Sequence, residues 1–226
     1  MKAQSKAEKA GVVIVEDHPM FRERLAHLIN KEQDMMVCGE ADNVSDALAL
    51  LKRLKPSLAI IDITLKGSGG LDLLKDLRAH GIDVPVLILS MHDESLYAER
   101  ALRAGAKGYI TKHEASAKVM VAIRQVLRGE VYLDQRVMAR ILQKIVGPAK
   151  TASERPIDRL TDRELAVFEL IGEGKTTREI GGRLHIGFTT VDTYRARIKE
   201  KLDLENAAQL HTEASRWMQK REAGVS

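Results

Sequence analysis

Three acidic residues follow two short apolar segments of the sequence. Glu16 and Asp17 come directly after residues 12–15, and Asp62 comes directly after residues 58–61. Short, continuous apolar segments of this kind are typical of buried parallel strands, and open α/β folds place their sites at the carboxyl ends of such strands. We therefore expect the three carboxylates to meet at one edge of a sheet.

A hydroxyl and an ammonium group are predicted at the same edge. Ser90 closes the apolar segment 86–89, and Lys112 follows residues 108–111. Carboxylate oxygens are ligands that Mg²⁺ prefers, and a bound cation screens the repulsion between a carboxylate nucleophile and a phosphorus atom. Any one of these residues alone is more often a solvated loop residue. Together, at successive strand ends, they indicate transfer of a phosphoryl group to a carboxylate.

The first 130 residues alternate between apolar segments and amphipathic segments. We expect strands at 12–16, 35–40, 58–62, 86–90 and 108–112. Each strand is expected to be followed by a helix, and these helices begin near Pro19, Asn43, Leu71, Ser95 and Ser116. Pro19 suits a first helical turn because its missing N–H has no helical partner there. Strands and helices in alternation predict a parallel sheet covered on both faces.

Length and composition favour an ordinary globular protein. The chain has 226 residues, enough for one large domain or two small ones, and a formal net charge of +4. We find no apolar run near the 18 residues that suggest a membrane span, and no apolar signal core in the first ten residues, so we expect a cytoplasmic protein without a membrane partner. The single cysteine, Cys38, is expected to be a buried, inert thiol.

The second part of the chain has only helical patterns. Residues 134–146 have the pattern of one helix, and residues 147–153 have the composition of a linker. Thr161 and Glu164 form a capping box, and helices are expected at 177–184, at 189–202 and from Asn206. The glycine-containing turn at 185–188 predicts a helix-turn-helix.

The helix expected at 189–202 has two different faces. Its apolar residues Val191, Ile198 and Leu202 are expected to pack inward. The opposite face carries Thr189, Thr193 and Arg197, flanked by Arg195, Lys199 and Lys201. Such a face fits a DNA major groove, although a solvated charged face is a common alternative. Net charge does not decide between them, because residues 158–226 have 12 basic and 12 acidic residues.

The strand-end residues also carry a family resemblance. Residues 12–17, 62–65, 70–71, 89–90 and 108–112 resemble the receiver domain of bacterial response regulators, over about residues 12–129. The resemblance implies a flavodoxin-like, five-stranded parallel (βα)5 fold in which a sensor histidine kinase phosphorylates Asp62. It implies that Mg²⁺ is bound by Glu16, Asp17, Asp62 and the carbonyl of Thr64. Ser90, Tyr109 and Lys112 correspond to the switch hydroxyl, the switch aromatic residue and the family's lysine.

Three positions depart from the usual receiver pattern. Lys66 and His113 stand where many receivers have proline, and Glu16 stands where many have aspartate. A glutamate still reaches a cation through water. We therefore expect these departures to leave phosphorylation possible.

Residues 160–164, 176–180, 190–194 and 201–202 resemble the LuxR-type helix-turn-helix, over about residues 160–214. Together with a receiver, this resembles the response regulators of the NarL/FixJ type, with an all-α, four-helix DNA-binding domain. The expected domains are a disordered tail at 1–10, a receiver at 11–130, a linker at 131–157 and the helix-turn-helix domain at 158–222. The resemblance implies promoter double-stranded DNA as a partner and a homodimer when phosphorylated or DNA-bound. The expected DNA-binding residues are Thr176, Thr177, Thr189, Thr190, Thr193, Arg195, Arg197, Lys199 and Lys201.

Two alternative functions stay open on the sequence. An aspartate-nucleophile phosphatase of the haloacid-dehalogenase type also has an Asp-x-Thr pattern like residues 62–64. In such phosphatases, however, the second acidic cluster follows the nucleophile in the sequence. Here the acidic pair, Glu16 and Asp17, precedes Asp62. The chain is therefore expected not to be an enzyme. A DNA-binding regulator that works without phosphorylation, with a vestigial acidic pocket, is the other alternative.

Overall fold

The computed structural model describes residues 9–65, 69–91, 94–146 and 156–222. The chain forms two compact units that divide between residues 147 and 148, and each unit is described by itself. Most of the expected tail, Lys66 and the expected linker residues 147–153 lie outside the described residues. Within the described residues, no helix is long and apolar enough to cross a membrane.

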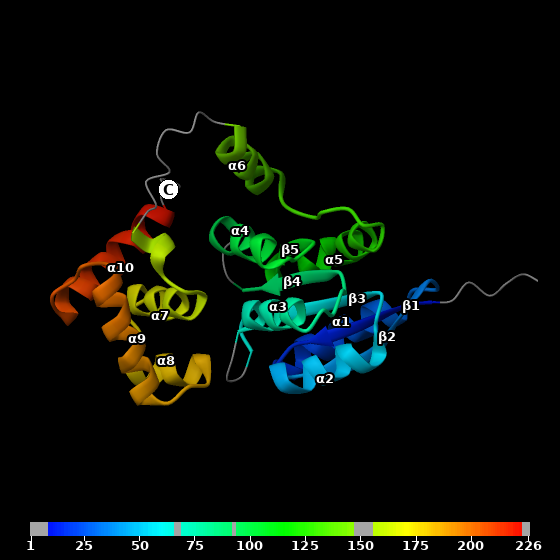
Figure 1. Ribbon diagram of the computed structural model, residues 1–226, viewed down its shortest axis with the longest axis horizontal. Coiled ribbons are helices and arrows are strands. Elements are labelled where there is room, and N and C mark those ends of the chain that lie inside the picture. The colour runs from blue at the N-terminus through cyan, green and yellow to red at the C-terminus, as the bar shows by residue number, and fades with distance from the viewer. Residues whose placement is uncertain (1–8, 66–68, 92–93, 147–155, 223–226) are drawn as a thin grey trace, which may run out of the picture. The chain divides into compact units, whose positions relative to one another are not determined.

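The first unit is built on a five-stranded sheet in which every neighbouring pair of strands is parallel. The strand order is β2-β1-β3-β4-β5, with β1 at Ala10–Val15, β2 at Met35–Ala41, β3 at Leu58–Asp62, β4 at Val86–Ser90 and β5 at Gly108–Thr111 (Figure 1). The predicted receiver-type sheet is thus confirmed. The chain runs from β1 outward to β2 and then returns to the other side of β1, so the topological switch point lies between β1 and β3.

Helices cover both faces of this sheet, which explains its continuous apolar strands. They are α1 at Pro19–Asn30, α2 at Val44–Leu54, α3 at Gly70–Ala79, α4 at Glu94–Ala104 and α5 at Lys112–Leu127. One core contains alternate residues of β1, β3 and β4 together with α1 and α5; its members include Val12, Ile14, Leu58, Ile60, Leu87, Leu89, Leu25, Ile29, Ile123 and Val126. The intervening strand residues, such as Val13 and Ile61, are also fully buried.

Two expected boundaries in the first unit are wrong. Helix α5 begins at Lys112, directly after β5, and not near Ser116. No proline or glycine separates this strand from the helix, and Glu114 places a negative charge in the first turn, where it interacts favourably with the helix dipole. The other boundary is the expected tail, because its last residue, Ala10, already belongs to β1.

A sixth helix, α6 at Gln135–Val146, also belongs to the first unit. It contacts α4, and its residue Val137 is buried. The helix expected within the linker is therefore confirmed. It packs against α4, so the first unit extends beyond residue 130, where the receiver was expected to end.

The second unit consists of short helices around α7 at Asp162–Gly172, which contacts α8, α9 and α10. The other elements are a 3-10 turn, η1, at Pro156–Arg159, α8 at Thr177–Leu184, α9 at Phe188–Lys201 and α10 at Ala207–Glu222. The buried core includes Leu165, Phe168, Ile171, Ile180, Leu184, Val191, Ile198, Leu210 and Ala214. This arrangement confirms the predicted helical domain.

The turn between α8 and α9 is short and well determined by the sequence. Thr176 and Glu179 form a capping box that starts α8, and His185 ends it in the left-handed conformation, with φ of 53°. The backbone N–H of Ile186 then donates to the carbonyl of Gly181 over 3.0 Å. Gly187 is the N-cap of α9, so three residues join the two helices.

The adjacent glycines of α8 provide a test of this turn. A methyl group at position 181 would lie 2.8 Å from the carbonyl oxygen of Ile186, whereas position 182 has open space around it. We expect Gly181→Ala to lower the free energy of unfolding, because the backbone of the turn must shift. Gly182→Ala should raise it by about 1 kcal/mol, the usual helix-propensity gain.

Urea unfolding of the two variants and the parent, followed by circular dichroism, measures this difference. Stabilisation by both substitutions would show that the turn is not packed as closely as the structure indicates.

Candidate functional site

The structure brings the predicted strand-end residues together at the carboxyl edge of the sheet. Glu16 and Asp17 follow β1, Asp62 ends the neighbouring β3, Ser90 ends β4, and Lys112 follows β5. All five are buried, with at most 8% of each exposed. Three carboxylates and one ammonium group thus lie close together and are largely shielded from solvent.

Lys112 is the counter-charge of this pocket. Its Nζ lies 2.9 Å from Asp62 Oδ2, 2.9 Å from Glu16 Oε1 and 2.6 Å from Glu16 Oε2. The same nitrogen lies 4.9 Å from the centre of the Phe21 ring, within the range of a cation–π contact. Burial lowers the pKa of Lys112, but its attraction to Asp62 and Glu16 outweighs this effect and raises the pKa above its ordinary value. Lys112 therefore carries its charge at neutral pH.

Asp62 is held in an environment that disfavours its charge. Burial raises the pKa of Asp62 from 3.8 to about 6. The nearby Lys112 opposes this shift, and the negative charge of Glu16 adds to it. A hydrogen bond from the backbone of Thr64 partly offsets this shift. The Oδ1 atom of Asp62 is buried without a hydrogen-bond partner among the described residues. Such an oxygen is an acceptor to which a cation can bind.

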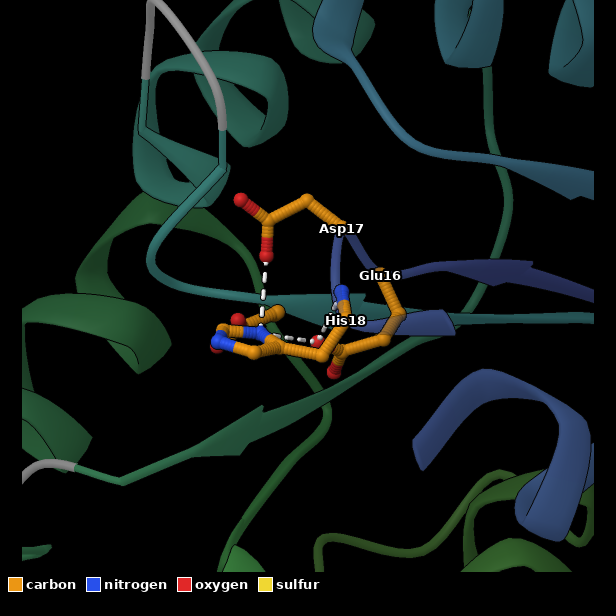
Figure 2. Close-up of side chains that lie close together, drawn as sticks. Glu16, Asp17 and His18 are labelled. Carbon is orange, nitrogen blue, oxygen red and sulfur yellow. Dashed lines mark hydrogen bonds and ion pairs between the residues drawn. The ribbon is translucent and has the colours of Figure 1, made fainter. Parts of the chain in front are cut away.

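His18 is a member of this site that our sequence interpretation missed. Its Nδ1 lies 2.8 Å from Glu16 Oε1 and 2.9 Å from Asp17 Oδ1. Dashed lines in Figure 2 mark the contacts of His18 with these two residues. Ligand atoms of His18, Glu16, Asp17 and Asp62 all lie within 4.8 Å of one another. The only signal in the sequence was its position, directly after the acidic pair.

The donor set fits a hard divalent cation. Three carboxylates supply the oxygen ligands that Mg²⁺ requires, and water can complete an octahedron. Among the described residues, Asp62 Oδ1 is one of the buried oxygens without a hydrogen-bond partner. Glu16, Asp17 and Asp62 are the residues that would hold it. Thr64 lies two residues after Asp62 and is partly exposed.

The two expected switch residues are both inside the protein. Ser90 and Tyr109 are each fully buried, and Ser90 pairs in register with Thr111 of β5. The ring of Tyr109, the expected switch aromatic residue, is thus already in a buried position.

The second unit presents the outward face of α9 that the sequence predicted. Thr189, Thr190, Thr193 and Arg197 are exposed, and Val191 and Ile198 are fully buried on the opposite side. Lys199 is partly exposed, and so is Leu202, which was expected to pack fully inward. The exposed face also contains Asp192, Ala196 and Glu200.

Two basic side chains expected to flank this face are bound within the unit instead. Arg195 donates to Thr177 Oγ1 over 2.6 Å, and its other terminal nitrogen lies 2.7 Å from His211 Nε2. Lys201 donates to Glu164 Oε2 over 2.6 Å, which directs it toward α7. These contacts join α9 to neighbouring helices, because long side chains reach partners that helical periodicity alone does not identify.

The polar residues at the start of α8 have capping roles. The Thr176 hydroxyl lies 3.3 Å from the backbone N–H of Glu179, from which it accepts a hydrogen bond. The Thr177 hydroxyl accepts the hydrogen bond of Arg195. Thr176 therefore stabilises the start of α8, and Thr177 joins α8 to α9.

Comparison with known protein families matches both units. Residues 12–124 match the family described as "Response regulator receiver domain", and residues 158–214 match "Bacterial regulatory proteins, luxR family". Among curated relatives, the DNA-binding transcriptional activator DevR/DosR of Mycobacterium tuberculosis is 31% identical over 198 residues, which cover 88% of this chain and 90% of that protein. The response regulator GacA of Pseudomonas aeruginosa is 31% identical over 199 residues, 88% of this chain and 92% of that protein.

Solved structures agree with these matches. A LuxR-family response regulator from Aurantimonas is 31% identical, with a TM-score of 0.57 over 62% of this chain and 99% of the other. The RcsB response regulator in complex with DNA is 22% identical, with a TM-score of 0.59 over 91% of this chain and 98% of the other, a likeness that concerns the fold alone. With both units matched and relatives that extend over most of its length, the chain belongs to the two-component response regulators of the NarL/LuxR type, which join a receiver domain to a LuxR-type helix-turn-helix.

Proposed function

We propose that phosphorylation of Asp62 controls the binding of this regulator to promoter DNA. The observation that supports this most directly is the buried Asp62 carboxylate, which has one oxygen bonded to Lys112 and the other without a hydrogen-bond partner among the described residues. Such a carboxylate has one oxygen available for a reaction and a positive charge beside it. The proposed donor is the phosphohistidine of a sensor histidine kinase.

The transfer itself is a displacement at phosphorus. An oxygen of Asp62 forms a bond to the phosphorus atom as the bond to the histidine nitrogen of the donor breaks. Glu16 and Asp17, together with Asp62 and the Thr64 carbonyl, would hold Mg²⁺, which would supply screening of the charge repulsion between the carboxylate and the phosphoryl group. The side chains of Ser90 and Lys112 then contact oxygens of the new phosphoryl group.

Lys112 is the residue through which the added charge acts on the fold. It now divides its hydrogen bonds between Glu16 and Asp62, and it is the first residue of α5. A phosphoryl group on Asp62 carries more negative charge than the carboxylate and competes for the same ammonium group. We propose that this redistribution shifts the equilibrium between two conformations of the receiver face formed by α4, β5 and α5. Ser90 and Tyr109 take part in this change.

In the proposed DNA complex, the exposed face of α9 enters the major groove. Thr189, Thr190 and Thr193 reach base edges there, and Arg197 and Lys199 reach bases or phosphates. Asp192 lies on the same face, where it repels phosphates. Lys201 is bonded to Glu164 and is not among the proposed DNA contacts. Arg195 and Thr177 join α8 to α9, and Thr176 caps α8.

The balanced charge of the DNA-binding domain favours binding to DNA as a dimer. Because residues 158–226 have equal numbers of acidic and basic residues, one copy gains little affinity from phosphate contacts. Two copies on one DNA molecule gain affinity through effective concentration. We therefore propose a homodimer in the active state.

We also propose domain boundaries that follow these elements. They are a receiver at 10–130, which begins with β1, a linker at 131–157 whose helix α6 packs on the receiver unit, and a helix-turn-helix domain at 158–222. A protein that acts on promoter DNA works where the chromosome is, which supports a cytoplasmic location. The proposed role is regulatory and not enzymatic.

Phosphorylation of Asp62 is tested by intact mass. With Mg²⁺ and acetyl phosphate, we expect the parent protein to gain one phosphoryl group that is lost on incubation, and Asp62→Asn to gain none. As a matched control, Asp83→Asn removes an exposed aspartate of the same unit and should be phosphorylated like the parent. Equal phosphorylation of parent and Asp62→Asn would contradict the assignment, and no gain in the parent would favour the regulator that works without phosphorylation.

The raised pKa of Asp62 predicts a pH-dependent stability. Because the pKa of Asp62 is about 6 in the folded state and 3.8 ordinarily, its contribution to stability is greatest below about pH 4 and is lost as the pH rises through 6. Without Mg²⁺ at pH 8, we expect Asp62→Asn to be more stable than the parent by about 1–3 kcal/mol, a difference that shrinks toward pH 4.

Urea unfolding in EDTA at several pH values measures this difference, with Asp83→Asn as the control. A parent protein as stable as Asp62→Asn at pH 8 would contradict the described charge balance.

The revised DNA-contact set is tested by two substitutions on α9. We expect Arg197→Ala to weaken DNA binding and to reduce the slope of log affinity against log salt by about one, because one phosphate contact is lost. Lys201→Ala should leave this slope unchanged and lower the free energy of unfolding by about 1–3 kcal/mol, because the buried Glu164 loses its ammonium partner.

Fluorescence anisotropy with a labelled duplex at several salt concentrations, together with urea unfolding, separates the two effects. A reduced salt slope in Lys201→Ala would return that residue to the DNA-contact set.

A further inference from the structure

His18 gives the acidic pocket a nitrogen atom that a magnesium site does not require. Its backbone at the N-cap of α1 is extended, with φ of −91° and ψ of 107°, and Pro19 follows in the first turn. The backbone N–H of His18 also donates to Glu16 Oε1 over 3.0 Å. The chain therefore turns back on itself here, and this turn places the imidazole ring against the two carboxylates (Figure 2).

The atoms of His18, Glu16 and Asp17 lie at hydrogen-bonding distances, and these distances also match the spacing of ligands around one ion. Neighbouring ligands of an octahedral cation, each about 2.1 Å from the metal, lie about 3 Å from each other. Nδ1 of His18 lies 2.8 Å from Glu16 Oε1 and 2.9 Å from Asp17 Oδ1. Asp62 contributes a further oxygen within the same 4.8 Å group, and its Oδ1 is a buried atom without a hydrogen-bond partner among the described residues.

The charge of the pocket also favours a dication. With Glu16, Asp17 and Asp62 ionised and Lys112 protonated, the four side chains carry two negative charges more than positive ones. One divalent cation neutralises this excess. The His18 side chain is 63% exposed, so an ion from solvent can reach its ring directly.

We propose that His18 is a ligand of the cation pocket and that it allows transition-metal dications such as Zn²⁺ and Co²⁺ to bind there through Nδ1. This inference rests on the proposed cation site of the phosphorylation mechanism and concerns which cations that site accepts. Imidazole nitrogen is a good ligand for zinc and cobalt, whereas magnesium prefers oxygen. His18 thus favours transition metals over magnesium, and a bound transition metal competes with Mg²⁺ for the pocket.

The test is a comparison of cobalt and magnesium binding to the full chain. Co²⁺ is the probe, because its visible absorption spectrum changes when a nitrogen ligand is replaced by oxygen. The variants are His18→Gln and, as a matched control, His27→Gln, which removes an exposed histidine from the other end of the same helix. The Asp62→Asn variant shows whether the cations bind in the acidic pocket. Thermal unfolding confirms that each variant is folded.

We expect His18→Gln to bind Co²⁺ and Zn²⁺ at least tenfold more weakly and to change the Co²⁺ spectrum, with Mg²⁺ affinity altered less than twofold. His27→Gln should behave like the parent, and Asp62→Asn should weaken the binding of all three cations. An equal loss of Co²⁺ and Mg²⁺ affinity in His18→Gln would overturn the proposal, because His18 would then only hold the carboxylates in place. Unchanged binding in His18→Gln would also overturn it.

Failure of the phosphorylation mechanism can be distinguished from failure of the cation proposal. If the parent shows His18-dependent Co²⁺ binding but no phosphoryl gain on Asp62, the proposed function is wrong and the cation site stands.

Discussion

The pocket depends on one electrostatic constraint, the burial of three carboxylates beside a single ammonium group. The adjacent ends of β1 and β3 place Glu16, Asp17 and Asp62 close together, and Lys112 is bonded to two of them. Buried like charges are costly unless they are compensated, and here the compensation is incomplete. The raised pKa of Asp62 is one result of this imbalance, and the suitability of the pocket for a divalent cation is another.

The same constraint connects the pocket to the rest of the receiver. Lys112 is both the counter-charge of Asp62 and the first residue of α5, so a change of charge at Asp62 acts directly on the start of a helix. Helix α6 extends the connection, because it packs on α4 of the same unit and precedes the helix-turn-helix. In the second unit, the ion pair between Lys201 and Glu164 joins α9 to α7. Burial raises the pKa of Glu164, but the bonds from Lys201 and Thr161 outweigh it and lower that pKa overall.

Much of this arrangement could be predicted from the sequence, for reasons that lie in particular residues. Parallel strands that are buried on both faces are continuous apolar runs, so their ends, and hence Asp62, Ser90 and Lys112, could be placed at one edge. His18 could not be found in this way, because its approach to Glu16 depends on the backbone angles of an N-cap. The contacts of Arg195 and Lys201 were missed because helical periodicity gives the direction of a side chain but not the partner that a long one reaches.

The most direct test of the account is the affinity of the full chain for DNA before and after phosphorylation. The probe is a fluorescent duplex of about 40 base pairs, long enough for two half-sites separated by one or two helical turns. The account predicts that acetyl phosphate and Mg²⁺ tighten the binding of the parent at least several-fold through dimerisation and leave Asp62→Asn unchanged. Equal affinity of the phosphorylated and unphosphorylated parent would contradict phosphorylation control.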